Sequence, residues 1–479
     1  MYKCEFLKKN VYIVLEIQSR ELYQQLLLST FLILNGYRVY IGDSQSILSL
    51  LKKKNKGGIF LNKGTIFRSE SKLIKKKCDY YCVLDQELTP GFTDSLTKWQ
   101  IEQRIINNTA NFIDRYYVIN DFIAKRVKKY FQKLRDKNTK VIATGWPKYD
   151  LYEKSFLTLF KKKIMAVKKK FKNYIIFNSN FGKLSEEEIA FDRKNLLNKY
   201  DLQKNAHVQK KIFKYKKDTL DDVQDTLPKV KNFLINLSKN FSKNNFLIRP
   251  HPGEYYLGWF KFCKQLKNFK VQKPKDDIMI SILASSGILH RGCTSGYEAT
   301  LLNRKSGYIK LTEQEKSRYS FRNILYETSH KIKNLDDFDH YCRKKVPKVT
   351  HEKKIRKLLN IDNKEYACEK ILKDMNLLTV NTEFSHKDIK TINLNDYPII
   401  FLFKKAIYDL LIFLKIKPER NKRYNKGLFH KFDNNFNAFF CKKFILQILK
   451  NSKFKKYKFK ISLKQISNKL IEIDNKAQI

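Results

Sequence analysis

The sequence contains little glycine and proline, 15 and 9 residues among 479. No Gly-x-Gly-x-x-Gly follows the first expected strand, Val11–Ile17, so an ordinary nicotinamide or flavin site is not expected. The eight cysteines lack paired metal-ligand spacing, which argues against zinc modules and indicates reduced thiols. No apolar run reaches the ~18 to 20 residues that span a bilayer, and Met1–Asn10 does not resemble a signal peptide. We therefore expect a cytoplasmic protein, either free or peripheral on the inner face of the cytoplasmic membrane.

Acidic residues are also scarce, with 47 Asp and Glu against 98 Lys and Arg, a formal charge of +51. A charge of this size suggests an anionic partner, either nucleic acid or a membrane surface. An AT-rich genome would also produce it, because Lys, Asn, Ile, Phe and Tyr are abundant together. The sequence shows no zinc knuckle and no aromatic-basic signature of an RNA-recognition module, so we do not expect a specific nucleic-acid partner.

Short apolar runs alternate with amphipathic segments, which indicates an α/β fold with parallel sheets. After Val11–Ile17 we expect a helix at Arg20–Leu34, capped by Ser19. The pattern continues to Asp150 and starts again at Tyr174. We expect an N-terminal Rossmann-like domain over residues 1–150 and a second over 151–379.

Two parts of the chain depart from this alternation. Residues 183–218 are charged and lack a clear hydrophobic period, so we expect a surface insertion followed by a helix from Leu227, with Thr226 as its cap and Pro228 in its first turn. Residues 380–479 are strongly basic, and we expect a helical extension. Within it, Pro398–Lys415 suits either a core helix or a helix lying among lipid headgroups.

The stretch Asn245–Glu254 combines an apolar run with a polar turn between two prolines. Proline disfavours continuation of the strand, so the strand should end near Arg249. Arg249, His251 and Glu254 would then lie at the carboxyl end of a buried strand, where ligands bind in open α/β sheets. The alternative to ligand binding by His251 is that its ring bonds to the backbone of the turn.

A similar pattern follows at Gly287–His290. Its turn begins at Arg291, which could face phosphate, while His290 is expected to pack inside. Thr294 and Ser295 suit either the cap of a helix or a phosphate site at its start. The candidate phosphate and nucleotide residues are Arg249, His251, Glu254, Arg291, Thr294, Ser295, Gly296 and Glu298.

Further candidates follow other expected strands. Asp85 and Glu87 are the candidate catalytic carboxylates, with structural roles as the alternative. A second group could contact substrate or belong to ordinary turns and helix starts: Ser19, Arg20, Asn178, Asn180 and Gly182.

Three segments together resemble a known family: Thr144–Asp150, Arg249–Glu254 and Thr294–Ala299. Over about residues 10 to 375 the chain resembles bacterial surface carbohydrate biosynthesis proteins, which are GT-B-fold glycosyltransferases. It is more distantly similar to polysialyltransferases, capsule Kdo transferases and CDP-glycerol glycerophosphotransferases.

The resemblance implies two Rossmann-like domains facing a central cleft, and inverting, metal-independent transfer from a nucleotide-sugar without a cofactor. It implies that His251, Thr294 and Ser295 contact the donor phosphate and that Glu298 contacts the ribose. The family's acidic motif, which supplies the base, has its nearest counterpart at Asp85–Leu88. There, Gln86 separates the two carboxylates and Leu88 stands where glycine is expected, so Asp85 is the alternative to Glu87.

The expected function is glycosyl transfer from a CMP-linked sugar to a lipid-linked surface polysaccharide or lipopolysaccharide. The basic C-terminal region would hold the enzyme at the inner membrane surface. Two alternatives are a catalytically degenerate GT-B scaffold, because the acidic motif is altered, and a protein that binds anionic polymers such as nucleic acid, because the chain is so basic.

Overall fold

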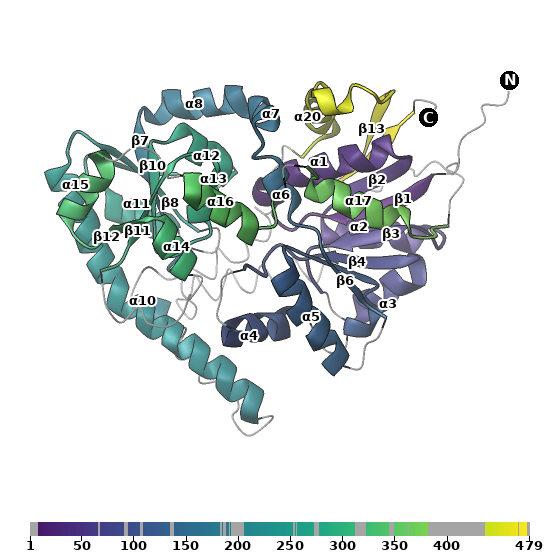
Figure 1. Ribbon diagram of the computed structural model, residues 1–479, viewed down its shortest axis with the longest axis horizontal. Helices are drawn as coiled ribbons and strands as arrows, with labels where there is room; N and C mark the ends of the chain where they lie inside the picture. Colours follow the sequence, from purple (N-terminus) through teal and green to yellow (C-terminus); the bar gives the residue numbers. More distant parts are fainter. Residues whose placement is uncertain are drawn as a thin grey trace, which may run out of the picture. The chain divides into compact units, whose positions relative to one another are not determined.

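The computed structural model describes residues 8–65, 68–90, 94–105, 109–134, 138–182, 184, 188–190, 192, 206–251, 254, 256–272, 277–311, 322–343, 349–362, 364–381, 436–467 and 469–476. They form two compact α/β units (Figure 1). Unit 1 contains the described residues up to Lys161, those from Arg356 to Asn381 and those from Phe436 onward, and unit 2 contains those from Lys162 to Ile355. The predicted pair of Rossmann-like domains is confirmed. The expected continuous segments 1–150, 151–379 and 380–479 differ from this division, because unit 1 is assembled from three separated segments.

The described strands of unit 1 form one sheet in the order β13-β14-β2-β1-β3-β4-β5-β6. Strands β1 to β6 are mutually parallel. β1 to β5 are largely buried, as strands covered on both faces must be, whereas β6 at the edge of the sheet is partly exposed. Their bounds are β1 Lys9–Val14, β2 Tyr37–Gly42, β3 Ile59–Asn62, β4 Tyr80–Leu84, β5 Arg115–Val118 and β6 Lys140–Ala143. Since β2 and β3 lie on opposite sides of β1, the strand order reverses between β1 and β3.

The helices of unit 1 include one that is buried on nearly all sides. This helix, α1 (Gln18–Leu34), contacts α6, α17 and α20 as well as β2 and β14. The other helical segments are α2 Ser44–Lys53, α3 Arg68–Lys77, α4 Asp94–Arg104, η1 Ala110–Phe112, α5 Asp121–Lys133, α6 Pro147–Asp150, α7 Lys154–Leu157, η2 Thr158–Phe160, α17 Ala367–Asn376, α20 Ala438–Leu449 and η3 Ser452–Phe454. An all-round apolar helix such as α1 is stable only when other elements cover it.

The start of α1 differs from the prediction. Ile17, not Ser19, is the residue before the helix, and it makes no side-chain cap. Instead, the Glu21 carboxylate accepts hydrogen bonds from the backbone N–H groups of Glu16 (2.7 Å) and Ile17 (3.2 Å). A carboxylate in the first turn is also favoured by the helix dipole, so Ser19 is not needed as a cap.

The C-terminal segment is not the helical extension that was expected. After α20 and η3 the chain forms β13 (Ile461–Ser467) and β14 (Leu470–Asn475), and β14 pairs antiparallel with β2, Leu470 opposite Gly42. Leu470, Ile471 and Ile473 are buried. β14 covers the free side of β2, which would otherwise expose a row of unpaired backbone groups. The segment Pro398–Lys415 lies outside the described residues.

The junction motif Thr144–Asp150 holds the returning chain on unit 1. Gly145 has φ +80°, and a Cβ there would lie 3.3 Å from the Asn360 carbonyl oxygen and 3.4 Å from the Ala367 Cβ. The buried Asp150 carboxylate accepts the backbone N–H groups of Ala367 and Cys368, both at 2.9 Å. It therefore caps the N-terminus of α17 from a distant part of the chain.

Asp150 makes the stability of unit 1 depend on pH. Burial raises the pKa of its carboxyl to about 7, against the opposing effect of the two N–H groups. The folded chain therefore binds this proton more tightly than the unfolded chain. Between the ordinary value and about 7, stability falls as pH rises, with a slope of at most about 1.4 kcal/mol per pH unit.

We expect Asp150→Asn to remove this slope. The measurement is urea unfolding of both proteins across this pH range, with the difference between their unfolding free energies plotted against pH. The advantage of the wild type over the variant should shrink as pH rises. A difference that is constant, or that grows with pH, would show that Asp150 is ionised in the folded chain throughout.

Unit 2 has a sheet of its own, whose described strands are all parallel and ordered β12-β11-β10-β7-β8-β9. The strands are β7 Tyr174–Asn178, β8 Asn245–Arg249, β9 Phe269–Val271, β10 Gly287–His290, β11 Lys305–Ile309 and β12 His330–Ile332. Two helices lie at the boundaries with unit 1: α8 (Lys161–Phe171) begins at one, and α16 (Val349–Leu358) spans the other at Ile355. The helices between them are α10 Ala206–Asn240, α11 Tyr256–Cys263, α12 Ile278–Ala284, α13 Ser295–Leu301, α14 Arg322–Thr328 and α15 Leu335–Arg343. This is the dinucleotide-fold order 3-2-1-4-5-6, which reverses between β7 and β10.

Two predictions about the segment before β8 are wrong. Helix α10 begins at Ala206, so Pro228 lies inside it and the Thr226 hydroxyl bonds to the Asp222 carbonyl instead of capping the helix. Leu184 and Ile189 belong to the buried core of unit 2, although residues 183–218 were expected to lie outside it. Isolated apolar residues in a charged segment give no period from which to predict burial.

None of the helices in the described part of the chain combines the length and apolar character that crossing a bilayer requires.

Candidate functional site

The strand order of unit 2 brings three predicted segments together. Asn178 at the end of β7 lies opposite Arg249 at the end of β8 and opposite His290 at the end of β10. The turns after these strands therefore surround the point where the strand order reverses. In open α/β sheets this is where a ligand binds, outside the carboxyl ends of the strands.

Two buried polar side chains at this point lack hydrogen-bond partners. Asn178 is 3% exposed, and among the described residues neither its amide oxygen nor its amide nitrogen has a partner. Within the same part of the chain the hydroxyl of Ser295, 1% exposed, is also unpaired. Buried polar groups are normally paired, because leaving one unpaired costs about 1–3 kcal/mol. A polar ligand at this sheet end would satisfy both.

The basic residues after β8 occupy different environments. Arg249 is buried, and its guanidinium lies 3.4 Å from the Ser281 hydroxyl of α12. His251 is exposed, and its carbonyl accepts the Glu254 N–H at 2.8 Å. Arg249 thus supports the strand end, whereas His251 is an accessible residue just after it.

Glu254, predicted to bind nucleotide, joins two loops of unit 2. Its buried carboxylate accepts hydrogen bonds from the Ser179 hydroxyl (2.5 Å), the Gly182 N–H (3.1 Å) and the Trp259 indole (3.1 Å). Burial raises the pKa of this carboxyl, and the three donors oppose the shift. Glu254 therefore fixes the loop after β7, on which Asn180 and Gly182 lie.

His290 is buried inside the unit, as expected, and its ring supports the turn after β10. Burial lowers its pKa to about 3, so the ring is neutral. Nδ1 accepts the Gly292 N–H at 3.2 Å, which leaves Nε2–H to donate to the Ser306 hydroxyl at 2.8 Å. Gly296 packs on this ring, because a Cβ there would lie 2.6 Å from Nε2 and 2.7 Å from Leu325 Cδ2.

The remaining predicted residues of unit 2 differ in accessibility. The Arg291 guanidinium lies over the Phe181 ring at 4.7 Å and 3.6 Å from an Asp222 oxygen, so it faces α10. Thr294 precedes α13 without a side-chain cap, and Glu298 is buried within that helix. The Asn180 amide donates to the Arg291 carbonyl at 3.4 Å, which links the turns after β7 and β10.

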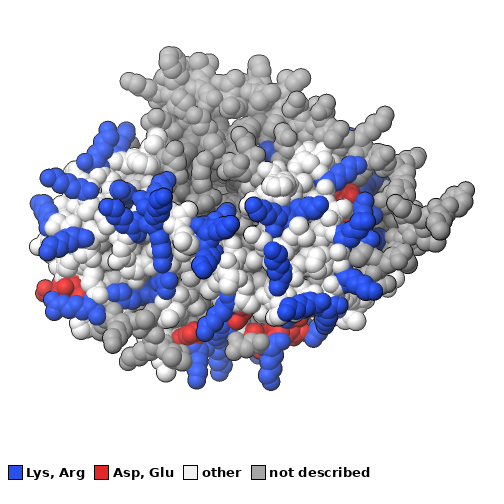
Figure 2. Space-filling model, turned by 90° about the horizontal axis from the view of Figure 1, so that it is seen from above, with Lys and Arg blue, Asp and Glu red and all other residues white. Residues whose placement is uncertain are grey.

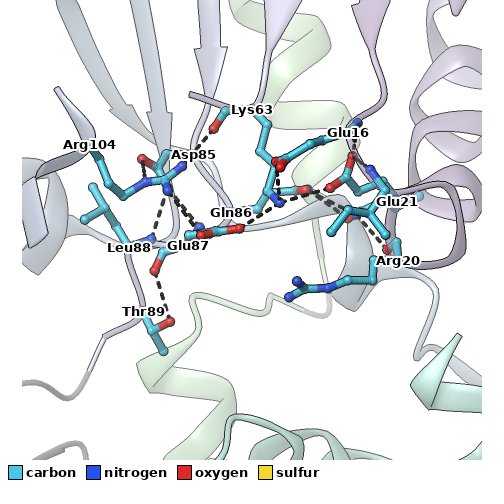
Figure 3. A network of polar contacts seen from close by, with 12 residues as sticks. Glu16, Arg20, Glu21, Lys63, Asp85, Gln86, Glu87, Leu88, Thr89 and Arg104 are labelled. Carbon is cyan, nitrogen blue, oxygen red and sulfur yellow. Dashed lines mark hydrogen bonds and ion pairs between the residues drawn. The ribbon is translucent and has the colours of Figure 1, made fainter. Parts of the chain in front are cut away.

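The carboxyl ends of the unit 1 strands carry a network of charged side chains (Figure 3). Lys63, just after β3, pairs with Glu16 (3.2 Å), Glu21 (3.0 Å) and Glu87 (2.7 Å). Gln86 and Gln24 exchange amide hydrogen bonds at 2.7 and 3.1 Å. The network lies where the strand order reverses between β1 and β3.

Asp85 is fully buried in this network. One carboxylate oxygen accepts the N–H groups of Glu87 (2.8 Å) and Leu88 (3.0 Å), and the other accepts Arg104 Nε (2.6 Å) and the Tyr116 hydroxyl (2.5 Å). Four donors saturate the carboxylate. These contacts favour a structural role for Asp85 over that of a general base.

Glu87 is more accessible, with 42% of its side chain exposed. Burial of its carboxyl opposes ionisation, but Lys63 and Arg104 outweigh that effect and lower its pKa to about 2. Glu87 can reach a substrate, but with these partners it is a weak base.

The two other candidates in unit 1 lie in the first turn of α1. Arg20 is exposed, and in Figure 3 its guanidinium lies beside the network with no dashed line joining it to a carboxylate. Ser19 is partly buried. Both follow β1, one of the two strands between which the strand order reverses.

Four residues that organise these sites were not among the predicted ones: Ser179, Trp259, Lys63 and Arg104. Ser179 follows a predicted strand directly, a signal that could have identified it. Lys63 and Arg104 are two among many basic residues, and only their pairing with Glu87 and Asp85 distinguishes them.

No group of three or more His, Cys, Asp or Glu side chains among the described residues is arranged to hold a metal ion. The expectations of metal-independent chemistry and of no cofactor stay predictions.

Comparison with known proteins yields structural likenesses only. No protein-family model matches the sequence, and no curated protein matches it. UDP-GlcNAc 2-epimerase from Neisseria meningitidis, bound to UDP-GlcNAc, is similar over 78% of this chain and 100% of its own, with 13% identity and a TM-score of 0.43. The wall teichoic acid polymerase TagF is similar over 77% and 89%, with 11% identity and a TM-score of 0.45. The S. aureus MnaA–UDP structure is similar over 77% and 98%, with 11% identity and a TM-score of 0.43.

Proposed function

We propose that this chain is a glycosyltransferase that binds a nucleotide-activated sugar at the carboxyl end of the unit 2 sheet. The observation that carries the proposal is the pair of buried, unpaired side chains in the described part of this unit, Asn178 and Ser295, at the reversal point of a 3-2-1-4-5-6 sheet. An amide and a hydroxyl suit the polar edges of a nucleotide and its phosphate. The proposed donor is a CMP-linked sugar, and the proposed acceptor is a lipid-linked surface glycan.

The leaving group needs positive charge or hydrogen-bond donors. In the proposed reaction the acceptor hydroxyl oxygen bonds to the anomeric carbon, the bond from that carbon to the phosphate oxygen breaks, and the electron pair leaves with the nucleotide. His251 and the hydroxyls of Thr294 and Ser295 would stabilise that phosphate. Glu298 would contact the ribose. Arg249, Glu254 and His290 would hold these groups in position through the contacts described above.

The proton of the acceptor hydroxyl must pass to a base. Glu87 is the proposed base, because its carboxylate is partly exposed whereas that of Asp85 accepts four hydrogen bonds. The low pKa of Glu87 supports a second candidate, a nucleotide-binding protein of the same fold without turnover. Release of CMP from CMP-linked sialic acid or CMP-Kdo separates the two, because only the enzyme hydrolyses or transfers the sugar.

Thermal unfolding with CMP, CDP, UDP and GDP tests the nucleotide site. A ligand at about 100 times its Kd stabilises by about 2.7 kcal/mol, which raises the Tm by several degrees. We expect a shift with cytidine nucleotides that is lost in His251→Ala and in Asn178→Leu. The second variant should keep its unliganded stability, because the Asn178 amide has no described partner to lose.

Asn245→Ala, at the opposite end of β8, is the matched control and should respond like the wild type. A shift with UDP or GDP instead would keep the site and change the donor. No shift with any of the four, or an undiminished shift in Asn178→Leu, would contradict the proposed site.

A further inference from the structure

Helix α20 has two faces of different character. Its inner face, formed by Cys441, Phe444, Ile445, Ile448 and Leu449, is buried. The helix packs on α1, and the Phe444 ring lies 4.8 Å from that of Tyr23. The inner face therefore accounts for how the helix is held on unit 1.

The outer face exposes large apolar side chains between lysines. Phe439 is 78% exposed and Leu446 is 37% exposed. Lys442, Lys443 and Lys450 are also exposed, and each stands three or four residues from Phe439 or Leu446. This outer face does not pack against the core of unit 1, although it carries large apolar side chains.

The segment after α20 extends the same composition. Lys455, Lys456, Lys458 and Lys460 are exposed, and Phe459 beside them is 42% exposed. Residues 436–467 contain no aspartate or glutamate. Figure 2 shows a face of the molecule on which Lys and Arg side chains are spread widely and carboxylates are few.

We propose that this α20 surface, defined as Phe439, Lys442, Lys443, Leu446, Lys450 and 455–460, docks on an anionic lipid bilayer. The lysines would lie among headgroup phosphates, and Phe439 and Leu446 would enter the boundary between headgroups and acyl chains. A nucleic acid is the less suitable partner, because an aliphatic side chain such as Leu446 gains little from phosphates. The proposal deepens the proposed function, since a lipid-linked acceptor is presented at such a surface, but it is measurable without nucleotide.

The experiment measures co-sedimentation of the full chain with vesicles of phosphatidylcholine alone, or of equal parts phosphatidylcholine and phosphatidylglycerol. The wild type should bind only the anionic vesicles. Replacing Lys442, Lys443 and Lys450 by Gln should lower the partition coefficient by about 100-fold, because each lysine near an anionic surface contributes about 1 kcal/mol. Phe439→Ser combined with Leu446→Ser should lower it by at least about tenfold.

The matched control replaces exposed residues of the same kinds elsewhere in unit 1, with Lys52→Gln, Lys53→Gln and Leu377→Ser. Leu377 is 75% exposed. The control should bind the vesicles like the wild type, and all variants should keep the wild-type Tm and its nucleotide-induced shift. Loss of vesicle binding with that shift intact supports the surface, whether or not glycosyl transfer is later detected.

Three results would overturn the proposal. One is a wild-type protein that does not bind anionic vesicles. Another is an equal loss of vesicle binding in the control variant, which would show that binding depends on total charge and not on this surface. The last is undiminished vesicle binding by the α20 variants together with loss of binding to a single-stranded oligonucleotide at the same salt, which would assign this surface to nucleic acid.

Discussion

Asp85→Ala should lower the free energy of unfolding of unit 1 by about 3–5 kcal/mol. The carboxylate is completely buried and accepts two backbone N–H groups, the Arg104 guanidinium and the Tyr116 hydroxyl. Without it, the Arg104 guanidinium loses its shortest ion pair and keeps only Glu87 and the Lys63 carbonyl. The buried Tyr116 hydroxyl and two backbone N–H groups lose an acceptor, and unsatisfied buried groups are costly. Glu87→Ala should cost less than about 1 kcal/mol, because its ion pairs are partly exposed.

Urea unfolding followed by circular dichroism compares the two variants with the wild type. Asp85→Asn provides a further comparison, because it keeps the shape of the side chain and removes its charge. A stable Asp85→Asn protein that has lost turnover would make Asp85 a catalytic residue and contradict the structural role. The nucleotide-induced shift of unit 2 should persist in every variant, which shows that the second unit is intact.

Glu254→Ala should both destabilise unit 2, by about 3 kcal/mol, and abolish nucleotide binding. The carboxylate accepts donors from Ser179, Gly182 and Trp259, and all three would be left without it. Because Ser179 and Gly182 belong to the loop after β7, the loop would lose its anchor beside Asn178. The matched control is Glu327→Ala, an exposed ion-pair partner of Lys354, which should change stability by less than about 1 kcal/mol.

The variant Glu254→Gln distinguishes two roles for Glu254, as an anchor of the loop after β7 or as a direct contact of the nucleotide. An amide keeps one acceptor oxygen but points N–H groups at existing donors, so an anchoring role predicts reduced stability and weaker nucleotide binding together. If Glu254→Gln unfolds like the wild type yet no longer responds to nucleotide, Glu254 contacts the nucleotide directly. Thermal unfolding with and without CMP measures both quantities in one experiment.

The amino-acid sequence by itself determined the alternation of strands and helices in both units and the end of β8. Buried parallel strands appear as short apolar runs, and Pro250 marks the end of β8 because proline disfavours continuation of a strand. Since the carboxyl ends of parallel strands meet, Arg249, His290 and Asn178 were predictable as members of candidate turns. These signals are local, and a single sequence carries them in full.

Tertiary structure alone decided which groups face each other. Strand order placed Asn178 between Arg249 and His290. It also placed Lys63 among three carboxylates from two distant segments, the segment that follows β1 and the turn after β4. The return of β14 to pair with β2, over 400 residues away, follows from the free side of β2 and not from any motif. Such pairings depend on which distant surfaces are left uncovered when the core forms. For this reason the hydrogen-bond partners of Asp85 and Glu254, which favour anchoring roles for both carboxylates, could not be predicted from the sequence.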